Sequence, residues 1–272
     1  METITSTGEC FFCKKPFDKS AINRHLKTHF KEKAKTEKAG NSYLLKIITN
    51  PRYGSSGYFL YLWVNGTATF RDLDDFLRAI WLECCGHMSS FTDLSKISAG
   101  GFRGNMFDFL EAENLMSSGN IKQYEAMMED SRGEIPKSRK LKAGLHKGQK
   151  IEYEYDFGST TSLLITVEED FEFAAPERVF LLSRNEPLEL LCETCKKEPA
   201  TEFCTVHGWG DECMFCPKCA KKHRKECPDF DDYAGMPIVN SPRMGVCAYA
   251  GGTIDTKRDG VFKKPKQDSR RS

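Results

Sequence analysis

The chain has 272 residues, a length typical of about two domains, and 39% of them are hydrophobic, which is enough for one sizeable core. Its formal net charge of +1 excludes a strong overall attraction to nucleic acid or to an anionic membrane. No apolar run approaches the ~20 residues of a membrane span, and the first residues lack the pattern of a signal peptide. We therefore expect a cytoplasmic protein with no membrane contact. In that compartment paired cysteines indicate metal ligands rather than disulfides.

The first expected element is a small cysteine and histidine unit at residues 8–30. Its spacing is that of a zinc finger with two cysteines and two histidines, Cys10, Cys13, His25 and His29. The two histidines are four positions apart, so on a helix they share one face and both can reach one ion. The sequence therefore predicts a zinc-binding finger, followed by a charged linker at residues 31–41.

Basic residues in this finger could contact DNA or RNA. Counting back from His25, the positions that face bases in such fingers are Asp18, Ala21 and Arg24, of which Arg24 could contact a guanine. A lone finger reads only about three base pairs, so a structural finger with a solvated lysine surface is the alternative. The residues predicted to contact nucleic acid are Lys14, Lys15, Lys19, Arg24 and Lys27.

The central region, residues 42–184, has the apolar content of a folded domain. Leu73, Phe76, Leu77, Ile80 and Trp81 recur at helical spacing and predict a helix over residues 70–85. Strands are expected on either side of it without a regular alternation of strand and helix. The fold class is therefore α+β, with a central mixed or antiparallel sheet flanked by small zinc-stabilised modules. The expected strands are residues 43–49, 58–64, 97–103, 150–157, 161–167 and 179–182, and a further helix is expected at residues 106–116.

A second cysteine-rich module is expected at residues 190–250, followed by a disordered basic tail at 251–272. Four ligand pairs are enough for two closed tetrahedral zinc sites. A cross-brace would pair the first with the third and the second with the fourth, giving one all-cysteine site and one mixed site. Sequential pairing, replacement of His207 by Cys213, or a single zinc with several free thiols are the alternatives. The predicted ligands are Cys192, Cys195, Cys204, His207, Cys216, Cys219, His223 and Cys227.

With the finger, this module raises the predicted zinc content to three ions. Its spacing is similar to that of B-box and MYND zinc modules, which mostly make protein contacts. The similarity therefore implies a protein partner, and closed four-ligand sites favour structural over catalytic zinc.

Three further segments resemble a known family. They are FLRAIWLECCGHMSSF at residues 76–91, EYEYDFGSTTSLL at 152–164 and VNSPRMGVCAYAG at 239–251. Together they are similar to the plasmid Orf-three-like domain family of the pRiA type, also described as passenger proteins of insertion sequences. The resemblance implies an α+β domain and a possible link to mobile elements. It implies no particular reaction.

Carboxylates on one predicted strand leave an enzymatic alternative open. Glu152, Glu154 and Asp156 alternate with aromatic residues, which is typical of a solvent-facing strand surface above a buried aromatic face. The same three could instead hold a divalent metal for a nuclease or another hydrolase. No coherent catalytic set accompanies them, so no catalytic residue is assigned. The leading hypothesis is a non-enzymatic zinc-binding adaptor that contacts a protein partner and nucleic acid.

Overall fold

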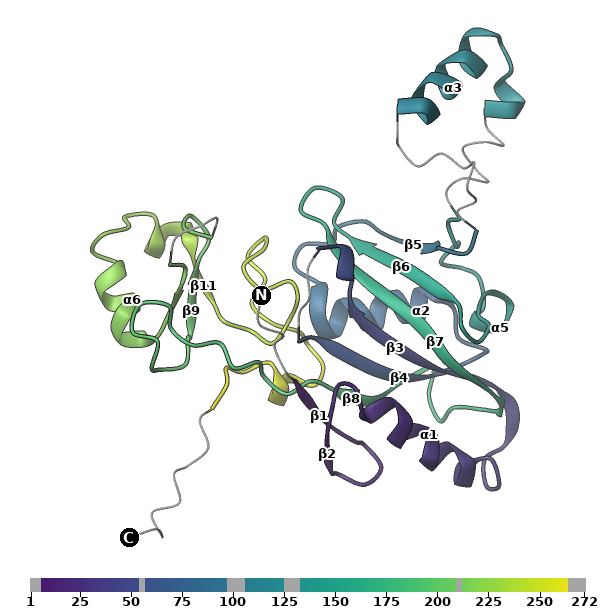
Figure 1. Ribbon diagram of the computed structural model, residues 1–272, viewed down its shortest axis with the longest axis horizontal. Coiled ribbons are helices and arrows are strands. Elements are labelled where there is room, and N and C mark those ends of the chain that lie inside the picture. The colour runs from purple at the N-terminus through teal and green to yellow at the C-terminus, as the bar shows by residue number, and fades with distance from the viewer. Residues whose placement is uncertain (1–5, 54–56, 97–105, 125–132, 209–211, 264–272) are drawn as a thin grey trace.

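A six-stranded antiparallel sheet forms the centre of the molecule (Figure 1). The computed structural model describes residues 6–53, 57–96, 106–124, 133–208 and 212–263. The sheet confirms the expected α+β class. Its spatial order is β5 (Ser89–Asp93), β6 (Lys150–Tyr155), β7 (Thr161–Phe173), β3 (Ala39–Thr49), β4 (Phe59–Asn65) and β8 (Val179–Arg184).

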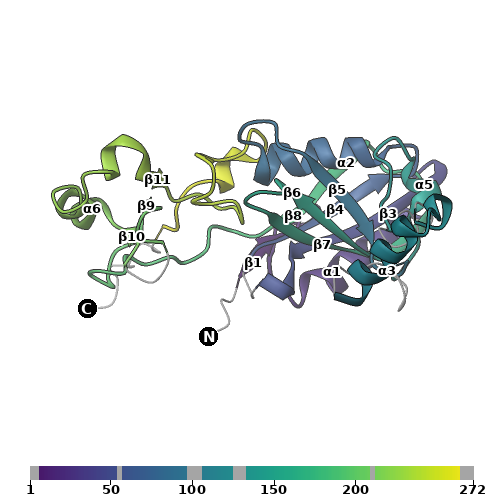
Figure 2. The same ribbon diagram turned by 90° about the horizontal axis from the view of Figure 1, so that it is seen from above.

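Helices cover both faces of this sheet, α2 on one side and α1 on the other (Figure 2). Alternate residues of β4 enter two separate cores, because successive side chains of a strand point to opposite faces. Leu60 and Leu62 pack in the core that contains α2 (Phe70–Leu77), whereas Tyr61 and Trp63 pack in the core that contains α1 (Ile22–Lys33). Burial on both faces explains why β4 is a nearly continuous apolar run.

The helix predicted over residues 70–85 is shorter than expected. It begins at a capping box in which the Thr69 hydroxyl accepts from the Asp72 backbone and the Asp72 carboxylate accepts from the Thr69 backbone. After Leu77 it continues only as a π-helical turn, Arg78–Leu82, and Glu83 is extended. Cys84 and Cys85 therefore lie beyond the helix.

The central region contains further helices. The helix α3 (Met106–Ser117) confirms the expected helix there, and α5 (Leu141–Gly144) precedes β6. The strand expected at residues 97–103 lies outside the described residues. None of the helices in the described ranges is both long and apolar enough to cross a bilayer.

Two small units flank the central sheet. The finger begins with the hairpin β1 (Thr7–Glu9) and β2 (Pro16–Asp18). The C-terminal module contains a three-stranded antiparallel sheet in the order β10-β9-β11, a short α-helix and a π-helical turn, Phe230–Ala234. It projects away from the central sheet in Figure 1. Its elements are β9 (Glu202–Cys204), β10 (Met214–Phe215), α6 (Pro217–His223) and β11 (Gly235–Pro237).

After this module the chain returns to the central domain. The Ser241 hydroxyl donates to the Trp81 carbonyl at 2.6 Å, and the Thr253 amide donates to the Ala79 carbonyl at 2.7 Å. The fully buried Arg184 guanidinium pairs with Asp259. A disordered tail was expected from residue 251. Thr253 and Asp259 of that stretch make two of these contacts, and residues 264–272 lie outside the described part of the chain.

Candidate metal centres

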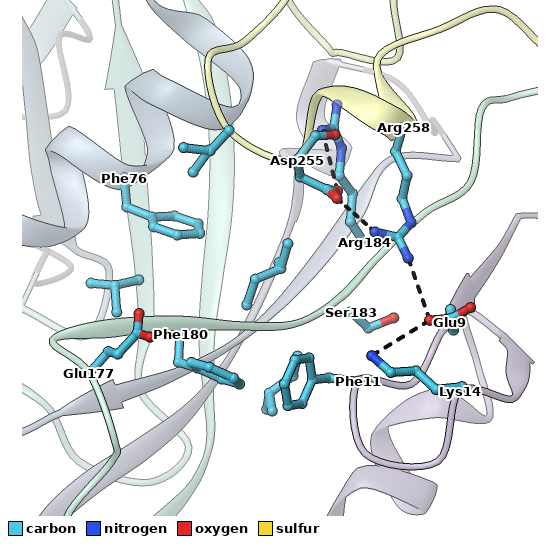
Figure 3. Close-up of a pocket in the computed structure, with 14 residues that line it drawn as sticks. Glu9, Phe11, Lys14, Phe76, Glu177, Phe180, Ser183, Arg184, Asp255 and Arg258 are labelled. Atoms are coloured by element: carbon cyan, nitrogen blue, oxygen red, sulfur yellow. Dashed lines mark hydrogen bonds and ion pairs between the residues drawn. The ribbon is translucent and has the colours of Figure 1, made fainter.

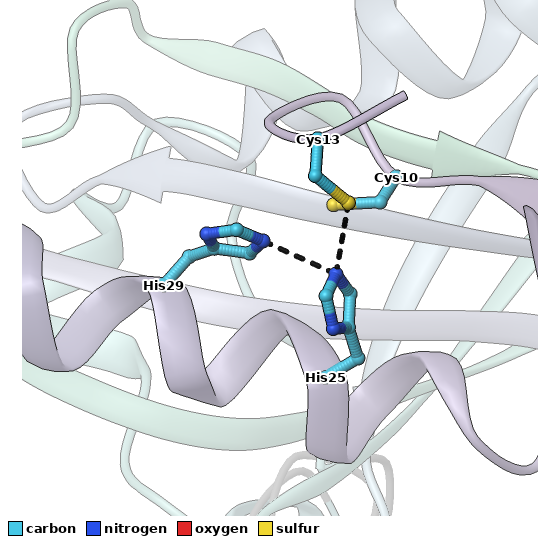
Figure 4. A group of neighbouring side chains, drawn as sticks. All are labelled: Cys10, Cys13, His25 and His29. Carbon is cyan, nitrogen blue, oxygen red and sulfur yellow. Dashed lines mark hydrogen bonds between the residues drawn. The ribbon is translucent and has the colours of Figure 1, made fainter. Parts of the chain in front are cut away.

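The four predicted finger ligands meet in one group (Figure 4). Cys10 and Cys13 come from the turn after β1, and His25 and His29 from α1. His25 Nε2 lies 3.2 Å from the Cys13 sulfur and 3.1 Å from His29 Nε2. Ligand atoms around a tetrahedral zinc ion are separated by about 3.3–3.8 Å, so the group can hold one zinc ion after small adjustments. Burial, with His29 and Lys15 nearby, lowers the pKa of His25 and favours the neutral form that binds metal.

The finger is packed against the central sheet. Leu26 and Phe30 of α1 are buried in the core beneath β4. The Phe30 ring stacks on Phe171 at 4.5 Å between centroids and meets Trp63 edge-on at 5.0 Å. Asn23 donates to the Glu168 carboxylate of β7 at 2.7 Å. The finger is therefore an integral part of the central domain.

The five basic residues predicted to contact nucleic acid have different surroundings. Lys14, Lys15 and Arg24 are exposed. Lys27 forms an ion pair with Glu169 of β7 at 2.9 Å, and its charge is thereby matched within the molecule. Burial lowers the pKa of Lys19. Nucleic-acid contact by these residues stays a prediction.

The C-terminal ligands gather in the two groups that the cross-brace predicts. The residue types explain this grouping, because each group joins ligand pairs of the same kind. In the all-cysteine group the Cys195 and Cys216 sulfurs lie 3.9 Å apart, and in the mixed group the Cys204 sulfur lies 3.2 Å from His207 Nδ1. The all-cysteine group is Cys192, Cys195, Cys216 and Cys219, and the mixed group is Cys204, His207, His223 and Cys227.

Local surroundings shift the thiol pKa values of this module in different directions, and burial raises the pKa of the group member Cys219 to about 12. Backbone N–H groups of Glu198 and Lys197 lower the pKa of Cys195 to about 7, which favours the thiolate. Burial and the Glu193 carboxylate raise the pKa of Cys213 to about 12, which favours the thiol. Cys213 belongs to neither of these groups. His207, and not Cys213, therefore completes the mixed group.

A fourth group of four potential ligands is not among the sequence-based predictions. It consists of Cys84, Cys85, His87 and Cys247. The Cys85 sulfur lies 3.0 Å from His87 Nε2 and 3.3 Å from the Cys247 sulfur. His87 Nε2 lies 3.3 Å from the same Cys247 sulfur. The adjacent cysteines and the nearby histidine were a signal in the sequence, but nothing local indicated Cys247 as their partner.

Asp156 lies beside this fourth group and not on the exposed face of β6. The strand ends at Tyr155, and Asp156 has a left-handed backbone with φ of 63°. One carboxylate oxygen accepts from the Arg243 guanidinium at 2.6 Å, and the other lies 3.6 Å from His87 Nδ1. The hydrogen bond from Arg243 lowers the pKa of Asp156 to about 2.

The other carboxylates of this strand remain on β6. Glu152 accepts hydrogen bonds from the side chains of Asn50 and Ser162. Burial and the charge of Glu152 raise the pKa of Glu154. The three carboxylates form no metal-binding group within the described residues.

A groove of about 400 Å³ runs beside the outer edge of β8 (Figure 3). Phe180 from the strand, Phe11 from the finger and Phe76 from α2 all line it. Its other apolar residues are Val179, Leu181, Leu182 and Ile254. Its polar and charged residues are Glu9, Lys14, Glu177, Ser183, Arg184, Asp255 and Arg258.

The comparisons with known proteins assign no family. No family model matches the chain, and no curated protein matches it. A similar solved structure is the crystal structure of a protein of unknown function, MM3350 from Methanosarcina mazei Go1. It shares 15% sequence identity at a TM-score of 0.33, over 53% of this chain and 67% of that one. A likeness at this level carries no argument about function, and the resemblance to the plasmid Orf-three-like family stays a prediction.

Proposed function

We propose that the protein is a non-enzymatic, zinc-stabilised adaptor that binds an extended segment of a partner protein in the groove beside β8. The observation that carries this proposal is the groove itself, which combines an apolar lining with the edge of a sheet. Extended peptides commonly bind by adding a strand to such an edge, while pockets beside it select their side chains.

The edge of β8 is only partly covered. The strand is the last of the six, and β4 pairs with one of its sides. On the outer side the Phe11 amide donates to the Leu182 carbonyl at 2.8 Å. Within the described residues no strand pairs with the outer side of Val179–Leu181. That stretch offers backbone groups to an incoming segment, and exposed edges of this kind readily pair with other chains.

The groove side chains suit an apolar peptide with charged flanks. Phe11 is 44% exposed although it meets Phe180 edge-on at 4.7 Å, so its ring retains surface for a ligand. Charged groups stand at the two ends, Glu177 at one and the ion-paired Lys14 and Glu9 at the other (Figure 3). Such a groove favours apolar anchors in the middle of the bound segment.

The zinc sites support an adaptor more than an enzyme. Each of the three predicted sites has four protein ligands, which leaves no coordination position for a substrate or for an activated water. Arg243 and Asn50 already engage Asp156 and Glu152, respectively. The alternative of a metal-dependent hydrolase that uses these carboxylates therefore has less support.

Contact with nucleic acid also has less support than a protein partner. The packing of α1 on the sheet restricts how the finger could enter a groove of DNA, and Lys27 is paired with an acidic residue. Exposed Lys15 and Arg24 leave phosphate contact as a further proposal. A link to mobile elements rests on the family resemblance alone.

A selection of peptides tests the adaptor proposal. The zinc-loaded full chain is screened against a displayed library of random peptides, and the affinities of selected peptides are measured for wild type, Phe11→Asp and Tyr233→Asp. Tyr233 is 68% exposed on the C-terminal module and serves as the matched control. We expect Phe11→Asp to weaken binding at least tenfold, about 1.4 kcal/mol, and Tyr233→Asp to bind as wild type. Failure to select any peptide, or equal binding by the two variants, would overturn the proposal.

A further inference from the structure

The fourth cysteine and histidine group lies where the C-terminal segment returns to the central domain. We propose that Cys84, Cys85, His87 and Cys247 bind a fourth zinc ion, and that this ion fastens the C-terminal segment to the central domain. Three of the ligands follow the π-helical turn, and the fourth lies 160 residues further along the chain from His87.

The geometry of the group suits one tetrahedral ion. All four ligand atoms lie within 4.8 Å of one another. The Cys85 sulfur lies 3.0 to 3.5 Å from the ligand atoms of the other three residues, and His87 Nε2 lies 3.3 Å from the Cys247 sulfur. Zinc–sulfur and zinc–nitrogen bonds of about 2.3 and 2.0 Å place tetrahedral ligands about 3.3–3.8 Å apart. Small side-chain adjustments therefore suffice to close a site.

The chemistry of the donors favours zinc. Three sulfurs and one imidazole nitrogen are the ligand set of many structural zinc sites. A disulfide is the competing arrangement for close cysteines, but the sulfurs of Cys85 and Cys247 lie 3.3 Å apart, well beyond the ~2.05 Å of a disulfide bond. All twelve cysteines are free thiols in the structure.

The backbone of this group repeats a feature of two of the predicted zinc sites. In the finger, the residue after the second cysteine is Lys14, with φ of 59°, and in the all-cysteine site it is Lys196, with φ of 53°. The corresponding residue here is Gly86, with φ of 76°. A left-handed residue at this position turns the chain back over the ligands. Its recurrence is independent of the side-chain distances.

Neighbouring polar groups orient the ligands as they do in known metal sites. The Asp156 carboxylate faces Nδ1 of His87 at 3.6 Å, so that Nε2 is left to face the sulfurs. Metal-binding histidines commonly use their second nitrogen in this way, with a carboxylate as the partner. The buried Arg243 guanidinium bonds to Asp156 at 2.6 Å and lies 3.6 Å from the Cys84 sulfur, where it offsets thiolate charge.

The proposed ion would cross-link the C-terminal segment to the central domain. Arg243 and Cys247 belong to the same segment, so one stretch of chain supplies both a ligand and the group that orients the others. Each of the other three groups contains at least one buried cysteine, whereas no ligand of the fourth group is buried. A chelator can therefore reach the fourth ion more easily, and we expect it to leave first.

Counting bound ions in the intact protein tests the proposal. Native mass spectrometry of the full chain, purified with zinc, is carried out on wild type, Cys247→Ser and Cys213→Ser. Cys213 belongs to none of the four groups and is the matched control. We expect four ions in wild type and in Cys213→Ser, and three in Cys247→Ser. Three retained ions would also show that the variant remains folded.

Hydrogen exchange tests separately whether the ion holds the C-terminal segment against the central domain. Backbone amides of residues 243–256 should exchange faster in Cys247→Ser than in wild type, and at the wild-type rate in Cys213→Ser. Four ions in Cys247→Ser, or three in wild type with zinc in excess, would overturn the fourth site. Unchanged hydrogen exchange in a variant that has lost one ion would overturn the proposed cross-link between the C-terminal segment and the central domain.

Discussion

The finger and the C-terminal module carry metal groups of similar composition but differ in what else holds them. Phe30 of the finger helix lies in a core shared with Leu44, Trp63 and Phe173 of the central sheet. The C-terminal module has its own core of six residues, two of which are metal-group cysteines, Cys204 and Cys227. The same kind of metal group therefore lies beside a large shared core in one region and supplies part of a small core in the other.

Size explains this difference. A small unit with few apolar residues to bury has little core of its own and commonly needs metal or disulfides to fold. The finger avoids this limit because α1 buries one face against the sheet. The C-terminal module has only its own small core, and we therefore expect its fold to depend on bound ions. Three predictions test this contrast.

Loss of one metal ligand should have the largest effect, and it should differ between the two regions. In Cys216→Ser we expect the module at residues 192–237 to lose its protection from hydrogen exchange, because structural zinc contributes about 10–16 kcal/mol in small zinc units. In Cys13→Ser we expect residues 22–33 to stay largely protected by the packing of Phe30. Equal loss of protection in both variants would contradict the contrast between the two regions.

Loss of one core phenylalanine should affect the central domain more than the C-terminal module, the reverse of the effect of losing a metal ligand. Phe30→Ala should lower the free energy of unfolding of the central domain by about 3–5 kcal/mol, because it leaves a cavity between α1 and the sheet. Phe230→Ala, in the small core, should leave that value unchanged. Urea denaturation followed by the fluorescence of the buried Trp63 and Trp81 measures the effect, in a Trp209→Phe background that removes the third tryptophan. An equal shift in the two variants would show that the two regions unfold as one unit.

A buried charge in the central domain should give the smallest effect and a distinct pH dependence. Asp74 accepts from Ser89, Tyr153 and Lys137, and these bonds outweigh burial and hold its pKa below the usual 3.8. Its stabilising contribution is therefore complete above that value and is lost as the pH falls through the lowered pKa of the folded state.

Asp74→Asn should accordingly cost about 1–3 kcal/mol at pH 7. The difference from wild type should narrow toward pH 3, although both proteins release zinc as the pH falls. Urea denaturation of the two proteins at pH 7 and pH 3 measures this difference in the free energy of unfolding. A difference that stays constant between these pH values would show that the charge of Asp74 does not matter.

Much of the fold could be predicted because its signals are local. The period of Leu73, Phe76 and Leu77 predicted α2, and the apolar run of residues 58–64 predicted β4. The end of α2 could not be predicted, because Cys84 and Cys85 continue the apolar period although the chain leaves the helix after Leu82. The docking of α1 on the sheet could not be predicted either, since the finger pattern alone does not indicate an external partner for Phe30.

Spacing and residue type, both present in the sequence by itself, determined three groups of potential ligands. The finger group is local, since a turn holds Cys10 near Cys13 and one helix face holds His25 near His29. In the C-terminal module, matching the ligand pairs by residue type was sufficient to predict the cross-braced grouping. Only the tertiary structure decided that Cys247 meets Cys85 and that Phe11 meets Phe180 at the groove. Those pairs form only when distant segments pack together, through contacts such as Arg243 with Asp156, which no local pattern specifies.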